Sequence, residues 1–373
     1  MKKTRFILFF LVIIIVVSLL TYLNYDKILN YFTNKEWQIA DSVGKIELEN
    51  YLGVCGTSSN FFVINNNNIE GYSELSKKTF DKNIDNKDIV TYTNNDFCVI
   101  AEKSSTNVTV FCSNEIIWTS NINNANILGA YINKNGYVAI IYSQTGYKSL
   151  IKVFSNTGEE LFTNYLASTY AIDVAISNDN KELAIAEVDT NGINVKSQIK
   201  VVNIKEASEN NIIKYELENN ELVTNVEYNE NNNLVVMSDS KVKMLTEGKL
   251  SEIINFESDN IIMSDISNTK NIITIRNNKN GLFNENIQVC IYDYENEEPY
   301  IYELQDVPNR IKCLEDIIAI DTGAEIIFLN TSGNFVKKCE YNGQLKDLVL
   351  FNEGDSAVLI FRDTADFIKV GGI

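Results

Sequence analysis

Short apolar runs separated by polar turns recur along the chain from residue 51 to the C-terminus. One block shows the pattern clearly, with apolar runs at 127–132, 137–143 and 149–154 and a shorter segment at 160–163. The intervening turns contain Asn-Gly and Thr-Gly pairs, which supply the positive φ angles of tight hairpins. The second run, YVAIIYS, is almost unbroken, which is typical of a strand buried on both faces. The block therefore predicts four consecutive strands.

This four-strand unit recurs about every 35–50 residues. Further units are predicted at 51–83, 88–122, 170–217, 221–256, 260–304 and 309–340. The last unit, 345–370, has only three strands, and a spare strand at 44–49 precedes the first unit. We therefore predict an all-β, WD40-like or quinoprotein-like β-propeller, whose N-terminal strand completes the C-terminal blade and removes the last free sheet edge.

The number of blades and two other architectures stay open at this point. We expect about eight four-stranded blades, and seven if the weakly patterned first unit is not a blade. A pair of β-sandwiches would not repeat four-strand units along the chain, and a parallel β-helix would show shorter, more regular rungs. The propeller is therefore the favoured fold.

Two consecutive blocks within residues 135–204 carry a more specific signature. The segments NGYVAIIYSQTGYKSLIKVFSNTGEELF and YAIDVAISNDNKELAIAEVDTNGINVKSQIKVVNI resemble a family of single-pass, membrane-anchored β-propellers of low-GC Gram-positive bacteria, classified as a domain of unknown function. The turn SNDNK at 177–181 also resembles the Ser-x-Asp-Gly-Lys turn of WD40-like and TolB-like repeats, in which Asp and Asn cap a hairpin. The resemblance implies an anchored propeller and brings no activity or catalytic residues.

An uncharged apolar segment, FILFFLVIIIVVSLLTYL, occupies residues 6–23 and is long enough to cross a bilayer as a helix. Lys2, Lys3 and Arg5 precede it, which predicts a single-pass plasma-membrane protein with its N-terminus in the cytoplasm and its body outside. A cleaved signal peptide is the alternative, but its apolar run would be shorter and no small-residue cleavage site follows. We expect a cytoplasmic N-terminus (1–5), a transmembrane helix (6–23), a stalk (24–43) and a propeller (44–373).

The composition excludes several classes of function. The chain has 50 acidic and 32 basic residues, a formal charge of -18 and no histidine. An acidic body is repelled by phosphate backbones, so we expect no nucleic-acid partner. Without histidine there is no Ser-His-Asp or Cys-His catalysis and no His-containing zinc site. The only tryptophans are Trp37 and Trp118, so the chain lacks the Trp-docking motif of quinoprotein dehydrogenases, and we expect no cofactor.

The six cysteines are widely spaced and form no C-x-x-C motif, so we expect no metal site. Cys98 and Cys112 lie on consecutive predicted strands, roughly symmetric about Ser105. They are a candidate disulfide in an oxidising compartment, and the alternative is two buried, reduced thiols. The acidic loops at 189–192 and 295–298 lack the alternating ligand spacing of a calcium loop and are interpreted as solvated turns.

Polar residues interrupt apolar strands that are predicted to line the central channel. These residues are Asp173, Asn225, Asp265 and Asp347. Because they would converge from several blades, they are candidate ligand-binding residues; the alternative is that they hydrogen-bond neighbouring strands or channel water. We predict a non-catalytic binding or scaffold module for envelope proteins or surface polymers. The alternative is a surface hydrolase or lyase that uses the channel carboxylates.

Overall fold

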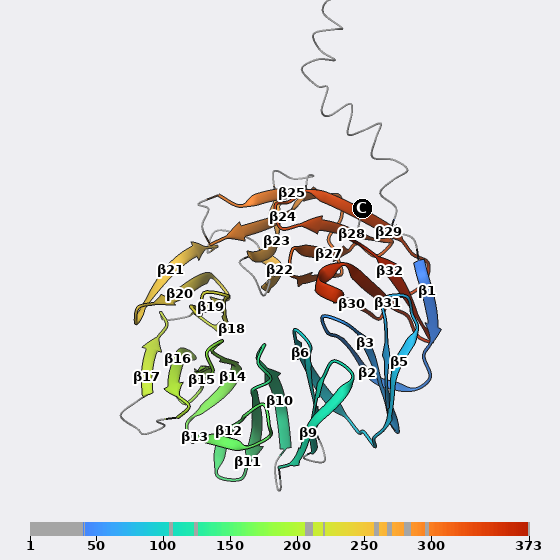
Figure 1. Ribbon diagram of the computed structural model, residues 1–373. Coiled ribbons are helices and arrows are strands. Elements are labelled where there is room, and N and C mark those ends of the chain that lie inside the picture. The colour runs from blue at the N-terminus through green and yellow to red at the C-terminus, as the bar shows by residue number, and fades with distance from the viewer. Residues whose placement is uncertain are drawn as a thin grey trace, which may run out of the picture.

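The structure, a computed structural model, describes residues 40, 42–103, 107–122, 126–205, 212–218, 221–256, 261–266, 271–279, 285–294 and 298–371. Within these residues the chain forms eight four-stranded antiparallel sheets, and these are arranged as blades around a ring (Figure 1). The predicted all-β propeller is therefore confirmed, and its number of blades is eight. The weakly patterned first unit is a complete blade, β2–β5.

Each blade is a simple meander in which consecutive strands pair from the inside of the ring to the outside. Blades 1 to 4 consist of β2 (Tyr51–Gly56), β3 (Phe61–Asn65), β4 (Asn68–Tyr72) and β5 (Lys78–Asn83); β6 (Ile89–Asn94), β7 (Phe97–Glu102), β8 (Asn107–Cys112) and β9 (Glu115–Asn121); β10 (Asn126–Ile132), β11 (Val138–Gln144), β12 (Tyr147–Phe154) and β13 (Glu160–Leu166); and β14 (Thr169–Ile176), β15 (Glu182–Asp189), β16 (Lys196–Asn203) and β17 (Ile212–Glu216). Blades 5 to 7 consist of β18 (Val223–Tyr228), β19 (Leu234–Ser238), β20 (Lys241–Thr246) and β21 (Lys249–Asn255); β22 (Ile261–Ile266), β23 (Asn271–Lys279), β24 (Glu285–Asp293) and β25 (Tyr300–Leu304); and β26 (Arg310–Leu314), β27 (Ile317–Asp321), β28 (Glu325–Asn330) and β29 (Phe335–Glu340).

Blade 8 closes the ring with strands from both ends of the propeller. Its strand order is β1-β32-β31-β30, where β30 is Asp347–Phe351, β31 is Ser356–Ile360, β32 is Thr364–Lys369 and β1 is Ser42–Glu47. A short 3-10 helix, η2 (Asn352–Gly354), joins β30 to β31. The N-terminal strand pairs antiparallel with the C-terminal one, with Lys45 opposite Asp366 and their side chains 3.3 Å apart. The predicted closure by the spare N-terminal strand is confirmed.

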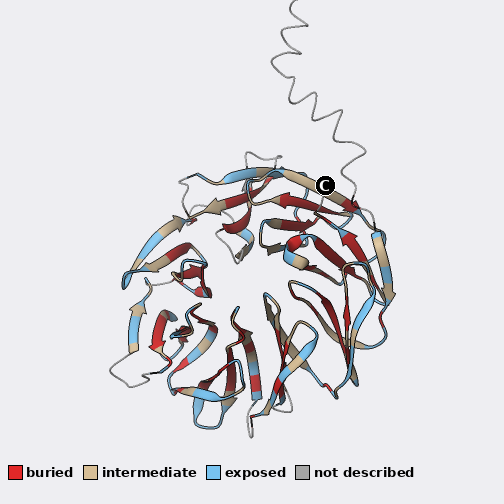
Figure 2. Ribbon diagram, in the orientation of Figure 1, coloured by how far each residue is buried: buried red, intermediate tan, exposed pale blue. Residues whose placement is uncertain are grey.

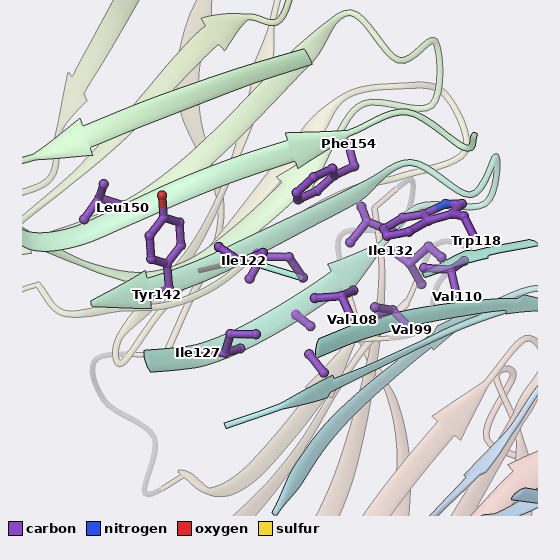
Figure 3. Close-up of a cluster of buried hydrophobic side chains, with 14 residues drawn as sticks. Val99, Val108, Val110, Trp118, Ile122, Ile127, Ile132, Tyr142, Leu150 and Phe154 are labelled. Atoms are coloured by element: carbon purple, nitrogen blue, oxygen red, sulfur yellow. The ribbon is translucent and has the colours of Figure 1, made fainter. Parts of the chain in front are cut away.

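The hydrophobic core lies between neighbouring blades. Figure 2 shows that buried residues concentrate on the middle strands of the blades and that the outermost strands are mostly exposed or half-buried. Val138 to Tyr142 of β11 are all buried, as the unbroken apolar run predicted. Figure 3 shows the layer between blades 2 and 3, where the Trp118 ring packs against Phe154 with ring centroids 5.6 Å apart. Each pair of neighbouring blades shares an apolar layer of this kind.

Asparagine side chains link the turns between the first and second strands of blades 3 and 4. Asn133 Nδ2 donates to the carbonyl oxygen of Ser177 at 3.1 Å and to Asn180 Oδ1 at 2.7 Å. Within the SNDNK turn, Ser177 Oγ donates to Asp179 Oδ1 at 2.8 Å, and Asn180 adopts a φ of 59°. The hairpin-capping role expected for this turn is confirmed.

The predicted cytoplasmic N-terminus, transmembrane helix (6–23) and most of the stalk lie outside the described residues. In the part of the chain that the structure describes, no helix has the length and hydropathy needed to span a bilayer.

Candidate functional site

The innermost strands of all eight blades enclose a central cavity of about 650 Å³. These strands are the inner edges of their sheets, so part of their backbone N–H groups has no partner within the ladder. Five of the eight, β2, β10, β14, β18 and β22, contain a β-bulge near their start. A bulge interrupts pairing and redirects side chains. The cavity wall therefore combines N–H groups that the ladder leaves available with redirected side chains.

All four residues predicted from the sequence line this cavity: Asp173, Asn225, Asp265 and Asp347. The structure thus brings together side chains from β14, β18, β22 and β30. Their role in binding a ligand stays a prediction. The sequence analysis missed further polar groups on the same wall, namely Tyr92, Tyr131, Glu227 and Lys312.

Asp173 connects blade 4 to blades 3 and 5. It is 9% exposed, and its Oδ2 accepts a hydrogen bond from the Val226 N–H of β18 at 2.9 Å. Burial raises the pKa of Asp173 to about 6, and hydrogen bonds from the Val226 and Val174 N–H groups and the Tyr131 hydroxyl limit this rise. Burial, followed by the nearby charge of Asp173, raises the pKa of Tyr131. The carboxylate therefore satisfies an edge N–H of the next blade.

Asp265 makes the equivalent connection from blade 6 to blade 7. Its Oδ2 accepts a hydrogen bond from the Cys313 N–H of β26 at 2.9 Å. Burial raises the pKa of Asp265 to about 6, and the charge of Lys312 opposes this rise. Two of the predicted site residues thus act as links between inner strands, in agreement with the structural alternative of the sequence analysis.

The other two predicted residues occupy different environments. Asp347 Oδ1 lies 3.5 Å from Arg310 Nη1 and accepts a hydrogen bond from the Leu348 N–H at 2.8 Å. Arg310 in turn lies 3.2 Å from the buried Asp321, so Asp347 belongs to an ion-pair network between blades 7 and 8. Asn225 is exposed on the cavity wall.

Among Asp173, Asp265 and Glu227, the residue with the largest change in pKa is Glu227. Burial, then the charges of Asp265 and Asp173, raises its pKa to about 8. Its carboxyl group is therefore mainly protonated near neutral pH and can donate a hydrogen bond. Together with Tyr92 and Tyr131 it gives the wall donors as well as acceptors, an arrangement suited to a polar ligand. Among the described residues, no three His, Cys, Asp or Glu side chains are grouped as a metal site.

The predicted pairing of Cys98 with Cys112 is wrong. In the β7–β8 ladder Cys98 lies opposite Phe111 and Cys112 lies opposite Phe97, so the two thiols point to opposite faces of the sheet. The symmetry about Ser105 misplaced the register by one residue, which is enough to reverse a side chain's face. Cys98 Sγ instead lies 3.3 Å from Cys55 Sγ of blade 1.

Comparison with solved structures supports the fold. The C-terminal WD40 domain of Sif2 aligns with a TM-score of 0.62 at 12% identity, covering 90% of this chain and 99% of that domain. BamB from Moraxella catarrhalis aligns with a TM-score of 0.51 at 14% identity, covering 89% of this chain and all of that one (100%). Apo AztD from Citrobacter koseri aligns with a TM-score of 0.55 at 10% identity, covering 82% and 90%. At these identities the similarity concerns the fold alone.

Sequence comparison adds the family. No curated protein matches the sequence significantly. A family profile matches residues 30–370, which include every blade of the propeller. The chain therefore belongs to a family of unknown function, DUF5711.

Proposed function

We propose that this protein is a non-catalytic binding scaffold of the envelope of a Gram-positive bacterium. A helix at 6–23 anchors it in the plasma membrane, residues 1–5 lie in the cytoplasm, and the propeller lies outside and binds an envelope protein. The apolar segment and the preceding Lys2, Lys3 and Arg5 support this topology. A rigid ring with many loops is a suitable platform for recognition.

The observation that carries this proposal is an exposed apolar surface on one rim of blades 3 and 4. In an antiparallel meander, the starts of the first and third strands and the ends of the second and fourth lie on the same side. Six exposed apolar side chains of these two blades lie at or beside such positions, and we call them the apolar rim: Leu128, Tyr147, Tyr165, Tyr170, Ile193 and Val195.

The apolar rim contains the features of a protein interface. Tyr165 is 58% exposed, and its ring contacts that of Tyr147 with centroids 5.1 Å apart. The ammonium of Lys148 lies 4.8 Å from the centre of the Tyr170 ring, which holds this ring in place. Exposed apolar groups that cluster mark interaction sites, and tyrosines often dominate their binding energy. The aliphatic members of the rim favour a protein partner over a polar polymer.

A pulldown with the full chain from detergent-solubilised membranes tests the proposal. The test variant is Tyr165→Ser combined with Ile193→Ser. The matched control is Leu161→Ser combined with Ile213→Ser, because both residues are exposed and start the fourth strands of the same blades, on the opposite rim. We expect the wild type and the control to recover the same partner protein, and the rim variant to bind it at least about tenfold more weakly.

Three results would overturn the proposal as stated. One is that the anchored wild type recovers no reproducible partner. Another is that the rim variant recovers the partner as well as the control does. The third is that the eluate contains a surface polymer and no partner protein, which would support the polymer alternative.

A surface hydrolase or lyase acting in the central cavity is the second candidate function. The observation that favours it is the separation in pKa between Glu227, at about 8, and Asp265, at about 6, because such pairs supply a general acid and a general base. Against it, Asp265 and Asp173 are hydrogen-bonded to the neighbouring inner strands. The Glu227→Gln variant separates the two functions, since a scaffold keeps its partner and a hydrolase or lyase loses turnover of any envelope polymer it cleaves.

A further inference from the structure

We propose that Cys55 and Cys98 form a disulfide that covalently joins blade 1 to blade 2. The two residues are 43 positions apart and lie on β2 and β7, in different sheets. Their sulfur atoms are 3.3 Å apart in the structure. A disulfide requires about 2.05 Å, so the sulfurs need to approach by little more than about 1 Å. This inference is independent of the proposed scaffold function.

The surroundings of the two thiols favour a sulfur–sulfur bond. Both residues are buried, Cys55 at 7% and Cys98 at 1% exposure, in the apolar layer between blades 1 and 2. This layer also contains Phe62, Ile64 and Phe111. The hydrogen bond with Cys55, followed by burial, raises the pKa of the Cys98 thiol. A disulfide carries no charge and no thiol proton that needs an acceptor, so an apolar layer accommodates it.

The central cavity supplies a route for the oxidant. Cys55 lines the cavity, whereas Cys98 is enclosed behind it. The Cys55 thiolate attacks a small disulfide oxidant and forms a mixed disulfide, which releases one thiol of the oxidant. Cys98 then attacks the Cys55 sulfur and releases the second thiol. In total, the two cysteines lose two protons and two electrons, and the disulfide of the oxidant is reduced to two thiols.

The disulfide would restrain blades 1 and 2, which follow the closing blade 8 around the ring. Blades 1 and 2 already meet through a backbone hydrogen bond from the Ser58 N–H to the Asn95 carbonyl oxygen at 2.9 Å, and Ser58 Oγ also contacts Asp96. These are non-covalent contacts that can open. A covalent link between β2 and β7 would keep blade 1 attached to blade 2 even when these non-covalent contacts open.

The test uses the full chain in detergent, treated with oxidised glutathione after complete reduction. We expect the number of thiols counted in denaturant to fall from six to four. Peptide mapping by mass spectrometry should then find the peptides of Cys55 and Cys98 linked, and the midpoint of thermal unfolding should rise by about 5 °C. Dithiothreitol should reverse all three changes.

Cys98→Ser is expected to abolish the linked peptides and the thermal shift and to keep glutathione on Cys55, and Cys112→Ser, in the same blade, is the matched control that should retain both the link and the shift. The mapping on the wild type decides the question even if Cys98→Ser fails to fold. In the wild type, retention of six thiols, glutathione left on Cys55, or a linked pair that contains any other cysteine would each overturn the proposal.

Discussion

Buried carboxylates occur in two regions of this propeller and are neutralised in different ways. Within blade 4, Glu187 on β15 is 0% exposed, and its Oε1 lies 2.6 Å from Lys200 Nζ. Its Oε2 accepts hydrogen bonds from Thr169 Oγ1 at 2.9 Å and from Gln198 Nε2 at 2.7 Å. This carboxylate therefore has a cation and two further donors, all provided by its own blade.

The carboxylates of the central cavity come from different blades and have mostly main-chain partners. Asp173 and Asp265 each accept an N–H of the next inner strand, and the pKa of both is raised by burial. Glu227 lies among them and holds its proton near neutral pH.

The difference follows from the position of the two regions. A strand inside a sheet has its backbone groups paired, so a buried charge there needs a side-chain cation. An inner edge strand offers N–H groups outside the ladder, which stabilise the Asp173 carboxylate without a cation; Asp265 has in addition the nearby charge of Lys312. The blade interior therefore supplies its buried carboxylate with a cation and side-chain donors, and the cavity is a region where protonation can respond to pH or to a ligand.

The largest effect is expected from breaking the pair inside blade 4. Lys200→Met leaves the Glu187 carboxylate buried without its cation, which should lower the free energy of unfolding by about 3–5 kcal/mol. The control is Lys152→Met, because Lys152 also lies 2.6 Å from a glutamate, Glu160, but the two side chains are 23% and 46% exposed. An exposed pair contributes less than about 1 kcal/mol. Denaturant unfolding measures both, and equal losses would contradict the distinction.

A smaller loss of stability is expected from substituting Asp173 in the cavity. This loss should depend more on its role as a hydrogen-bond acceptor than on its charge. Asp173→Ala leaves the Val226 N–H and the Tyr131 hydroxyl without their acceptor and should cost about 1–3 kcal/mol. Asp173→Asn keeps an oxygen acceptor and removes the charge, so its cost should be clearly lower. Urea unfolding of the two variants at pH 7 tests this. Similar losses would show that the charge of Asp173 matters more than its hydrogen bonds.

Much of the fold followed from local patterns. The predicted unit 51–83 coincides with β2–β5, and the three-strand unit at the C-terminus correctly implied a strand from the N-terminus. Both predictions depend on the spacing of the apolar runs, on the turn residues between them and on the number of strands in a unit. These features can be read from continuous stretches of sequence. The first unit is weakly patterned in the sequence, but Phe61, Phe62 and Ile64 supply a normal blade core.

The candidate site was only partly predictable, because its groups meet across blades. Glu227 could have been found, since it is two residues from Asn225 and side chains repeat with a period of two along a strand. Tyr92 is aromatic and gives no such signal, whereas Lys312 stands between Ile311 and Cys313 and could have been found. The contact between Cys55 and Cys98 depends on how blade 1 packs on blade 2, and the error for Cys112 came from a shift of one residue in register.

The smallest expected effect is on the pH dependence of the free energy of unfolding, and it tests Glu227. Its pKa is raised from 4.5 to about 8 in the folded state, so between these values the folded chain holds a proton that the unfolded chain has lost. The contribution of Glu227 to stability is therefore complete below about pH 4.5 and is lost as the pH rises through about 8. The slope is at most about 1.4 kcal/mol per pH unit.

Glu227→Gln should remove this contribution, so the stability difference between variant and wild type should shift in favour of the variant from pH 6 to pH 8. Asp173 and Asp265 contribute in the same direction, but mainly below about pH 6. The control is Glu216→Gln, an exposed residue at the end of β17. Urea unfolding at pH 5, 6, 7 and 8 measures the slopes. If Glu227→Gln and Glu216→Gln show the same slope, Glu227 is ionised throughout this range, and its position in the cavity does not hold a proton near neutral pH.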